Sequence, residues 1–317
     1  MDGLPGAFQV MFAMPRQRTL KSAISCRGIG LHSGRPITLG LHPAPVGHGL
    51  VFRRTDLGVD IPARFDRVGD TRLCTALVAG GVRIGTVEHV LAALAGLGID
   101  NALITVDGPE IPIGDGSADD FVFLLDSAGF IEQDAVRGAI EILDTVRVSE
   151  GAAWAELAPG ELFGQPVLEM EAVIDFPAPA IGRQGLSLVL SPENFRAELA
   201  RARTFALASE IAALHEAGLA RGGSLENAVV VDGARVLNPS GLRMADEFVR
   251  HKLLDAVGDL ALAGAPLIGR FRAERAGHRL HNLLLRALFA RPEARRAVVA
   301  DPGAAGRGRA LLGAAAA

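Results

Sequence analysis

The chain has 317 residues, of which 49% are hydrophobic and 21% are charged, as is usual for a soluble globular protein of about two domains. Its formal net charge is −4 and no basic block occurs, which argues against a nucleic acid as the main partner. Two cysteines are too few for a disulfide framework and favour the cytoplasm, and no run of about 18 apolar residues could span a membrane.

The first half reads as short strands followed by two helices. β-Branched or alternating apolar residues between Gly, Pro and Ser breaks predict strands at 23–29, 37–42, 49–53 and 101–106, and a hairpin at 73–78 and 82–84. A helix is expected to start with Thr86 as its N-cap and to stop at Gly96 and Gly98. Apolar residues at i, i+3, i+4 and i+7 predict a second helix, 121–128, which ends at Gly129.

The second half repeats this broad order. Strands are predicted at 139–148, 154–157, 167–174, 186–190, 228–231 and 267–274, and helices at 192–201, 206–217, 248–260 and 278–289. Strands grouped before helices, without strict alternation, predict an α+β class. We expect a flexible leader at 1–16, domains at 17–131 and 138–295, and a flexible tail at 300–317, with the boundary where the apolar pattern breaks at 131–138.

The helix predicted at 248–260 has two different faces. At about 100° per residue, Asp255, Asp259 and Lys252 lie within about 100° of His251, opposite an apolar face. His251 and Asp255, four residues apart, could bind one metal ion. The alternative is a surface helix that carries an ordinary His/Asp pair.

His89 extends this set, because two histidines and one carboxylate leave an open position for water on a zinc ion. Glu88 precedes His89 and could act as general base beside that water. His32, in the glycine-rich turn 28–34, is interpreted as a loop residue and not as a ligand. Sequence spacing alone does not show that His89 meets the later helix.

Several segments, in this order, resemble the UDP-3-O-acyl-N-acetylglucosamine deacetylase family, over about residues 17–289. The segments are 86–89 (TVEH), 100–101 (DN), 110–112 (EIP), 115–118 (DGSA), 203–205 (RTF) and 246–255 (DEFVRHKLLD). The resemblance implies two α+β domains of similar topology, each a β-sheet layered against helices, with the active site at their interface. It also implies zinc-dependent hydrolysis of the N-acetyl group of UDP-3-O-(3-hydroxyacyl)-N-acetylglucosamine, which releases acetate as the committed step of lipid A biosynthesis.

The same resemblance assigns the metal and the base. One zinc ion per chain would be held by His89, His251 and Asp255. Glu88 would deprotonate the water that the zinc activates, since zinc lowers the pKa of water towards about 7.

The resemblance also implies a proton donor and an oxyanion contact. His278 would be a cationic acid that steadies the oxyanion and protonates the leaving amine, with Asp259 raising its pKa. Thr204 would donate to the tetrahedral oxyanion.

Substrate contacts follow from the matched positions. Lys252 and Phe205 would contact the sugar and diphosphate, Asp175 and Phe176 the nucleotide, and Arg275 the diphosphate. An apolar groove for the acyl chain would come from an insert at about 177–230. Its candidate residues, each otherwise ordinary core, are Ile211, Ala220 and Val230, with Leu31 and Cys74 near the zinc. A thiolate ligand from Cys74 is disfavoured.

The sequence leaves two other functions open. One is a zinc amidase acting on another acylated amine, which would share the ligands but not the nucleotide contacts. The other is a non-catalytic sugar-nucleotide- or acyl-binding protein, whose natural form would lack Glu88 or His278. The alanine-ended tail resembles a segment gripped by a regulatory protease, and an inert frayed end is the alternative.

Overall fold

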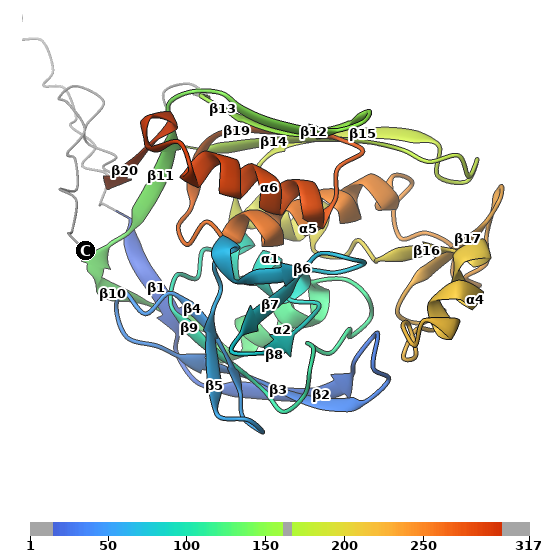
Figure 1. The fold of residues 1–317 in the computed structure, drawn as a ribbon. Helices are drawn as coiled ribbons and strands as arrows, with labels where there is room; N and C mark the ends of the chain where they lie inside the picture. Colours follow the sequence, from blue (N-terminus) through green and yellow to red (C-terminus); the bar gives the residue numbers. More distant parts are fainter. Residues whose placement is uncertain (1–14, 161–166, 300–317) are drawn as a thin grey trace, which may run out of the picture.

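The computed structural model describes residues 15–160 and 167–299. The predicted tail at 300–317, and residues 1–14 of the predicted leader, lie outside the described residues. Helices occupy the middle of the molecule, between a β-layer from the first half of the chain and one from the second half (Figure 1). The α+β class predicted from the sequence is confirmed. No helix within the described ranges is both long and apolar enough to cross a bilayer.

The first half forms a five-stranded sheet and two small sheets. The five strands run in the order β2 (Ile24–Ile29), β3 (Pro36–Pro43), β9 (Ala102–Val106), β4 (Leu50–Arg54) and β5 (Val59–Pro62). Strand β3 buries Ile37, Leu39 and Leu41 while Thr38 between them is exposed, so one face of the pleat forms core. The small sheets contain β6 (Val68–Asp70), β7 (Ala76–Ala79) and β8 (Val82–Ile84), and β1 (Arg16–Leu20) with β10 (Phe130–Val136).

The second half forms a seven-stranded sheet around β19 (Leu267–Glu274), which is antiparallel to β13 and parallel to β11 and β14. Its other strands are β11 (Gly138–Ile142), β12 (Val146–Glu150), β13 (Ala153–Ala158), β14 (Leu168–Asp175), β15 (Arg183–Val189) and β20 (Arg295–Val299). A separate small sheet contains β16 (Phe205–Leu207), β17 (Val229–Asp232) and β18 (Arg235–Val236), and lies with α4 at one end of the molecule (Figure 1).

Six α-helices connect these strands in the described residues. They are α1 (Glu88–Gly96), α2 (Asp119–Ala128), α3 (Pro192–Asn194), α4 (Ala208–Glu216), α5 (Glu247–Ala261) and α6 (His278–Phe289). Two single 3₁₀ turns, η1 (Phe65–Arg67) and η3 (Pro292–Ala294), and a π-helical turn, η2 (Phe195–Leu199), complete the elements. Helices α5 and α6 pack under the seven-stranded sheet, and α1 packs between α5 and α2 (Figure 1).

Helix α5 is buried around almost its whole circumference, including the polar face that carries His251, Asp255 and Asp259. The alternative of an ordinary surface helix is therefore wrong. Gly258 permits the close packing of α5 on α1, because a Cβ at this position would lie 2.0 Å from the carbonyl oxygen of Glu88.

The predicted N-cap of α1 is wrong. The helix begins at Glu88 after Val87, and no side chain caps it. Thr86 instead adopts a positive φ of 56°, and its hydroxyl oxygen lies 3.4 Å from Glu110 Oε2. The buried carboxylate of Glu110 therefore holds the side chain that the sequence assigned to the helix end.

Other boundaries differ because tertiary pairing outweighs local pattern. The strand predicted at 139–148 is two strands, β11 and β12, which pair with different partners. The helix predicted at 192–201 is a short α-turn followed by a π-turn, and β16 takes the start of the helix predicted at 206–217. The sequence did not predict β1, β5, β6, β10, β18 or β20 as separate strands.

Strand pairing bears on the division into domains. Each strand pairing in the described residues joins strands from the same half of the chain, with β10 paired to β1 and β11 paired to β19 and β20. We continue to propose two domains, at 17–131 and 138–295. The paired strands β10 and β20 run past these bounds, to residues 136 and 299.

Candidate active site

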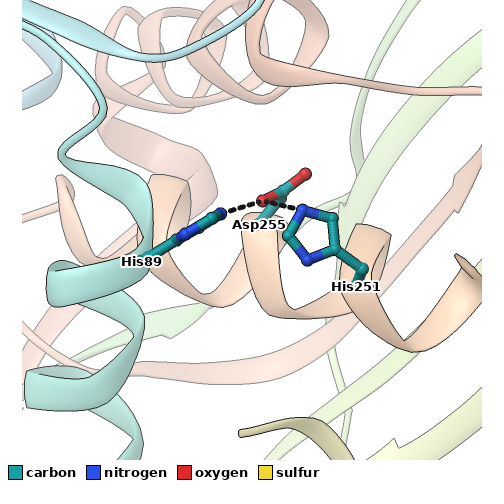
Figure 2. A group of neighbouring side chains, drawn as sticks. All are labelled: His89, His251 and Asp255. Carbon is teal, nitrogen blue, oxygen red and sulfur yellow. Dashed lines mark ion pairs between the residues drawn. The ribbon is translucent and has the colours of Figure 1, made fainter. Parts of the chain in front are cut away.

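The packing of α1 on α5 brings His89 to the pair that α5 carries (Figure 2). His89 Nε2 lies 3.5 Å from Asp255 Oδ1, and His251 Nε2 lies 3.3 Å from the same oxygen. The two imidazole rings meet edge to face, with centroids 5.0 Å apart. The predicted ligand set therefore converges from the two halves of the chain.

The donor atoms fit a metal ion. Asp255 Oδ1 is buried without a hydrogen-bond partner among the described residues. His251 Nδ1 donates to the carbonyl of Ala202 at 3.0 Å, which leaves the lone pair of Nε2 directed at Asp255. Burial lowers the pKa of His251 to about 3, so its ring is neutral. Burial opposes ionisation of Asp255, but its contacts with His251, Lys252 and His89 together hold the pKa of that carboxyl well below its ordinary value.

Lys252 binds the other oxygen of the same carboxylate. Its Nζ donates to Asp255 Oδ2 at 2.9 Å and lies 5.4 Å from the ring centroid of Phe205. Burial favours the neutral amine, but the Asp255 carboxylate outweighs it and raises the pKa of Lys252. Lys252 thus remains an ammonium at the edge of the cluster, where it is partly exposed.

Glu88 and His278 face each other beside these ligands. Glu88 is the first residue of α1, and its Oε2 accepts a hydrogen bond from the backbone N–H of Thr75 at 3.0 Å. His278 is the first residue of α6, and its Nε2 lies 3.9 Å from Glu88 Oε1. Burial is the main cause that raises the pKa of Glu88. Burial lowers the pKa of His278, but Asp259 and then Glu88 outweigh it and raise this pKa to about 9.

Asp259 lies beyond His278 and accepts three hydrogen bonds. Its Oδ2 accepts from Nδ1 of both His278 and His281, each at 2.8 Å, and its Oδ1 accepts from the hydroxyl of Thr75 at 2.5 Å. Sequence reasoning found Asp259 and His278 but missed His281 and Thr75. The signal for His281 was its position three residues after His278, which places both on one face of α6.

Thr204 and Phe205 adjoin α5 from the second-half insert. The backbone N–H of Thr204 donates to the carbonyl of Gly116, in the first half, at 2.8 Å. The ring of Phe205 packs edge to face on Phe248, with centroids 5.0 Å apart, and its centroid lies 6.3 Å from that of His251. The first-half loop around Gly116 therefore helps to place both residues.

The residues matched to nucleotide contacts lie together at the ends of β14 and β19. Arg275 forms an ion pair with Asp175, and Arg183 lies 3.8 Å from the same carboxylate. The Phe176 ring packs edge to face on Phe205, with centroids 5.3 Å apart. An aromatic pair therefore connects this charged group with the surroundings of His251.

The residues expected around the acyl chain occupy several elements. Leu31 accepts a hydrogen bond from Gly222 N at 2.9 Å, so its loop joins the turn that contains Ala220. Ile211 lies on α4 and Val230 on the adjacent strand β17, where Val230 is buried. In the part of the chain that the structure describes, no hydrogen bond, ion pair or ring contact joins either of them to His89, His251 or Asp255.

Cys74 is buried, with Arg83 3.6 Å from its sulfur. Burial and then the Glu88 carboxylate raise the pKa of Cys74 to about 12, so a thiol is present near neutral pH. A thiolate ligand stays disfavoured.

A cavity of about 550 Å³ lies elsewhere, between the ends of α1 and α5 and the strands that follow them. Its lining includes Gly96, Asp100, Leu260 and Leu267, and none of the predicted site residues. The buried polar cluster, and not this cavity, contains the residues that the sequence predicts as acid, base and metal ligands.

Known proteins resemble this chain over most of its length. The model of the family described as UDP-3-O-acyl N-acetylglycosamine deacetylase matches residues 17–290. The UDP-3-O-acyl-N-acetylglucosamine deacetylase of Shewanella woodyi is 52% identical over 283 residues, which cover 88% of this chain and 91% of that protein. Those of Idiomarina loihiensis and an Anaeromyxobacter species are 52% and 49% identical, over 89% of this chain and 92% and 91% of theirs. The chain therefore belongs to the UDP-3-O-acyl N-acetylglycosamine deacetylase family.

Proposed function

We propose that this enzyme hydrolyses the N-acetyl group of UDP-3-O-(3-hydroxyacyl)-N-acetylglucosamine and releases acetate, as the committed step of lipid A biosynthesis. The observation that carries the proposal is the buried convergence of His89, His251 and Asp255 beside Glu88 and His278. Relatives about half identical to this chain bear the name of this deacetylase. The absence of long apolar helices from the described residues is compatible with the cytoplasmic location that we propose.

One zinc ion per chain would be held by Nε2 of His89, Nε2 of His251 and the Asp255 carboxylate. Two imidazoles and one carboxylate are a donor set that zinc accepts in hydrolases. When bound, zinc would supply Lewis-acid polarisation of the acetyl carbonyl and increase the acidity of water. Lys252 would remain beside the set through Asp255 Oδ2.

Glu88 and His278 would divide the proton transfers. As water adds to the acetyl carbon, its proton passes to Glu88, whose carboxylate the Thr75 N–H orients. His278, cationic at neutral pH because of Asp259, then donates a proton to the amine as the C–N bond breaks. Acetate and a free glucosamine amine result. Thr204 would donate a hydrogen bond to the oxyanion of the tetrahedral intermediate.

The rest of the substrate would extend along the aromatic pair. Lys252 and Phe205 would contact the sugar and diphosphate, and Arg275 the diphosphate. The nucleotide would meet Asp175 and Phe176, which adjoin Phe205. The acyl chain would lie in a groove that includes Leu31, Cys74, Ile211, Ala220 and Val230.

Acetate release from the UDP-sugar by zinc-loaded protein tests the proposal. Glu88→Gln keeps the size of the side chain but removes the base, so we expect a loss of about a hundredfold or more in kcat. Exchange of the exposed Glu216 for Gln is the matched control, because it lies on α4 away from the cluster. Equal rates for wild type and Glu88→Gln would exclude Glu88 as the base.

The same assay separates the two other functions. Turnover that UDP does not inhibit would favour an amidase for another acylated amine. Tight substrate binding without turnover in zinc-loaded protein would favour a binding protein. Atomic absorption on the purified protein, with His251→Ala as the ligand-deficient control, measures whether one zinc is bound per chain.

We also propose that a regulatory protease acts on the tail, residues 300–317, which lie outside the described residues. The apolar, alanine-ended sequence supports this proposal. Exchange of residues 314–317 for aspartates should lengthen the cellular half-life, and an unchanged half-life would contradict it.

A further inference from the structure

Asp259 accepts more hydrogen bonds than its proposed role beside His278 requires. The two imidazoles of His278 and His281 share Oδ2, and Thr75 binds Oδ1. An ionised carboxylate can only accept hydrogen bonds, so Nδ1 of each imidazole carries a proton. Burial opposes ionisation of Asp259, but these neighbours, His278 first, hold the pKa of Asp259 well below its ordinary value.

His281 is held rigidly in this arrangement. It lies one turn after His278 on α6, and only 2% of its surface is exposed. Its ring packs edge to face on Phe271 of β19, with centroids 5.7 Å apart. The imidazole can therefore restrain the carboxylate that it contacts, since its own orientation is fixed by packing.

We propose that His281 is a positioning residue for the deacetylation, because its Nδ1–H fixes the Asp259 carboxylate that orients His278 towards Glu88. The proposal rests on the proposed function, in which His278 is the acid. Thr75 restrains the opposite oxygen, so the plane of the carboxylate is set by donors from both halves of the chain. The Nε2 atom of His278 is thereby directed at Glu88.

His281 also affects the charge balance at His278. The titratable groups that act on His278 are Asp259, Glu88 and Asp255, and the partly positive N–H of His281 reaches the same Asp259 oxygen. By sharing that oxygen, His281 reduces the attraction that Asp259 exerts on the proton of His278. Loss of this N–H should therefore raise the pKa of His278.

Three substitutions separate hydrogen bonding from packing. The amide nitrogen of His281→Asn can occupy the place of Nδ1 and donate to Asp259. His281→Gln carries its amide one carbon farther from the backbone, near the place of Nε2, and His281→Leu has no donor. The matched control is His42→Leu, because the ring of His42 bonds Thr105 in the first-half sheet, 3.0 Å away.

The assay is acetate release by zinc-loaded protein across the pH range. We expect His281→Leu and His281→Gln to lose about tenfold or more in kcat, as is usual when a residue behind a catalytic group is removed. KM should stay unchanged and the alkaline limit of kcat should move to higher pH, whereas His281→Asn and the His42→Leu control should resemble wild type. Wild-type kcat and pH profile in His281→Leu would overturn the proposal, and so would equal losses in the Asn and Leu variants.

Histidine-labelled NMR of the zinc-loaded protein, without substrate, makes the test independent of the proposed function. The resonance of His278 should titrate at higher pH in His281→Leu than in wild type and His281→Asn. An unchanged titration would overturn the proposal. If wild type releases no acetate, the proposed function fails while this measurement still decides the role of His281. If His281→Leu does not fold by circular dichroism, the Gln and Asn variants supply the same comparison.

Discussion

Gly258 of α5 lies against the start of α1, the other helix of the proposed active site. A Cβ there would lie 2.0 Å from the carbonyl oxygen of Glu88, whereas real Cβ atoms essentially never come within 3.0 Å of a heavy atom from a distant part of the chain. Gly258→Ala must therefore move the start of α1 away from α5 by about 1 Å. The clash is with backbone atoms of Glu88, so no flexible side chain can rotate to relieve it. That movement displaces both Glu88 and His89.

Two effects on stability oppose each other. Alanine favours a helix interior by up to about 1 kcal/mol over glycine. Overpacking typically costs about 1–3 kcal/mol, and a backbone contact belongs at the upper end of that range. We expect a net loss of about 1–2 kcal/mol in the free energy of unfolding, which leaves the protein folded and allows its activity to be measured.

The rate of acetate release should fall strongly, although the free energy of unfolding changes little. A displacement of about 1 Å at a catalytic centre can cost about a hundredfold in rate. Acetate release and zinc content of Gly258→Ala should therefore both decrease while its circular dichroism stays native. The control is Gly138→Ala, because a Cβ there would meet only Val298 O, at 3.9 Å. Wild-type kcat and zinc content in folded Gly258→Ala would refute the reasoning.

Three further results are expected. Asp259→Asn removes the carboxylate that raises the pKa of His278 to about 9 from an ordinary 6.5, so the alkaline limb of kcat/KM should move to lower pH; an unmoved limb would assign it to another group. Glu247→Gln leaves Arg203 buried without its charged partner, 2.8 Å away, and should lower the free energy of unfolding, measured in urea, by about 3 kcal/mol or more. Cys74, with a pKa of about 12, should resist iodoacetamide at pH 8 in native protein and react after denaturation; rapid native labelling, detected by mass spectrometry, would contradict its burial.

The sequence by itself determined the elements whose pattern repeats locally. The strand at 267–274 and the helix at 278–289 have the expected bounds, and α5 extends the expected helix by one residue at each end. Motifs within α1 and α5 also indicated the ligand types. Such signals depend on neighbouring residues, so they can be read without knowledge of the fold.

Only the tertiary structure decided which side chains meet. Thr75 and Asp259 are separated by 184 positions, so no local sequence pattern could predict their hydrogen bond. Thr86 is a second example: it does not cap α1 as predicted, because its side chain contacts the buried carboxylate of Glu110. His89 reaches Asp255 because burial of apolar residues packs α1 on α5. Gly258 allows this close packing, because any side chain at its position would hold the two helices apart. The buried polar face of α5 thus acquires its partners through nonlocal packing of the hydrophobic core.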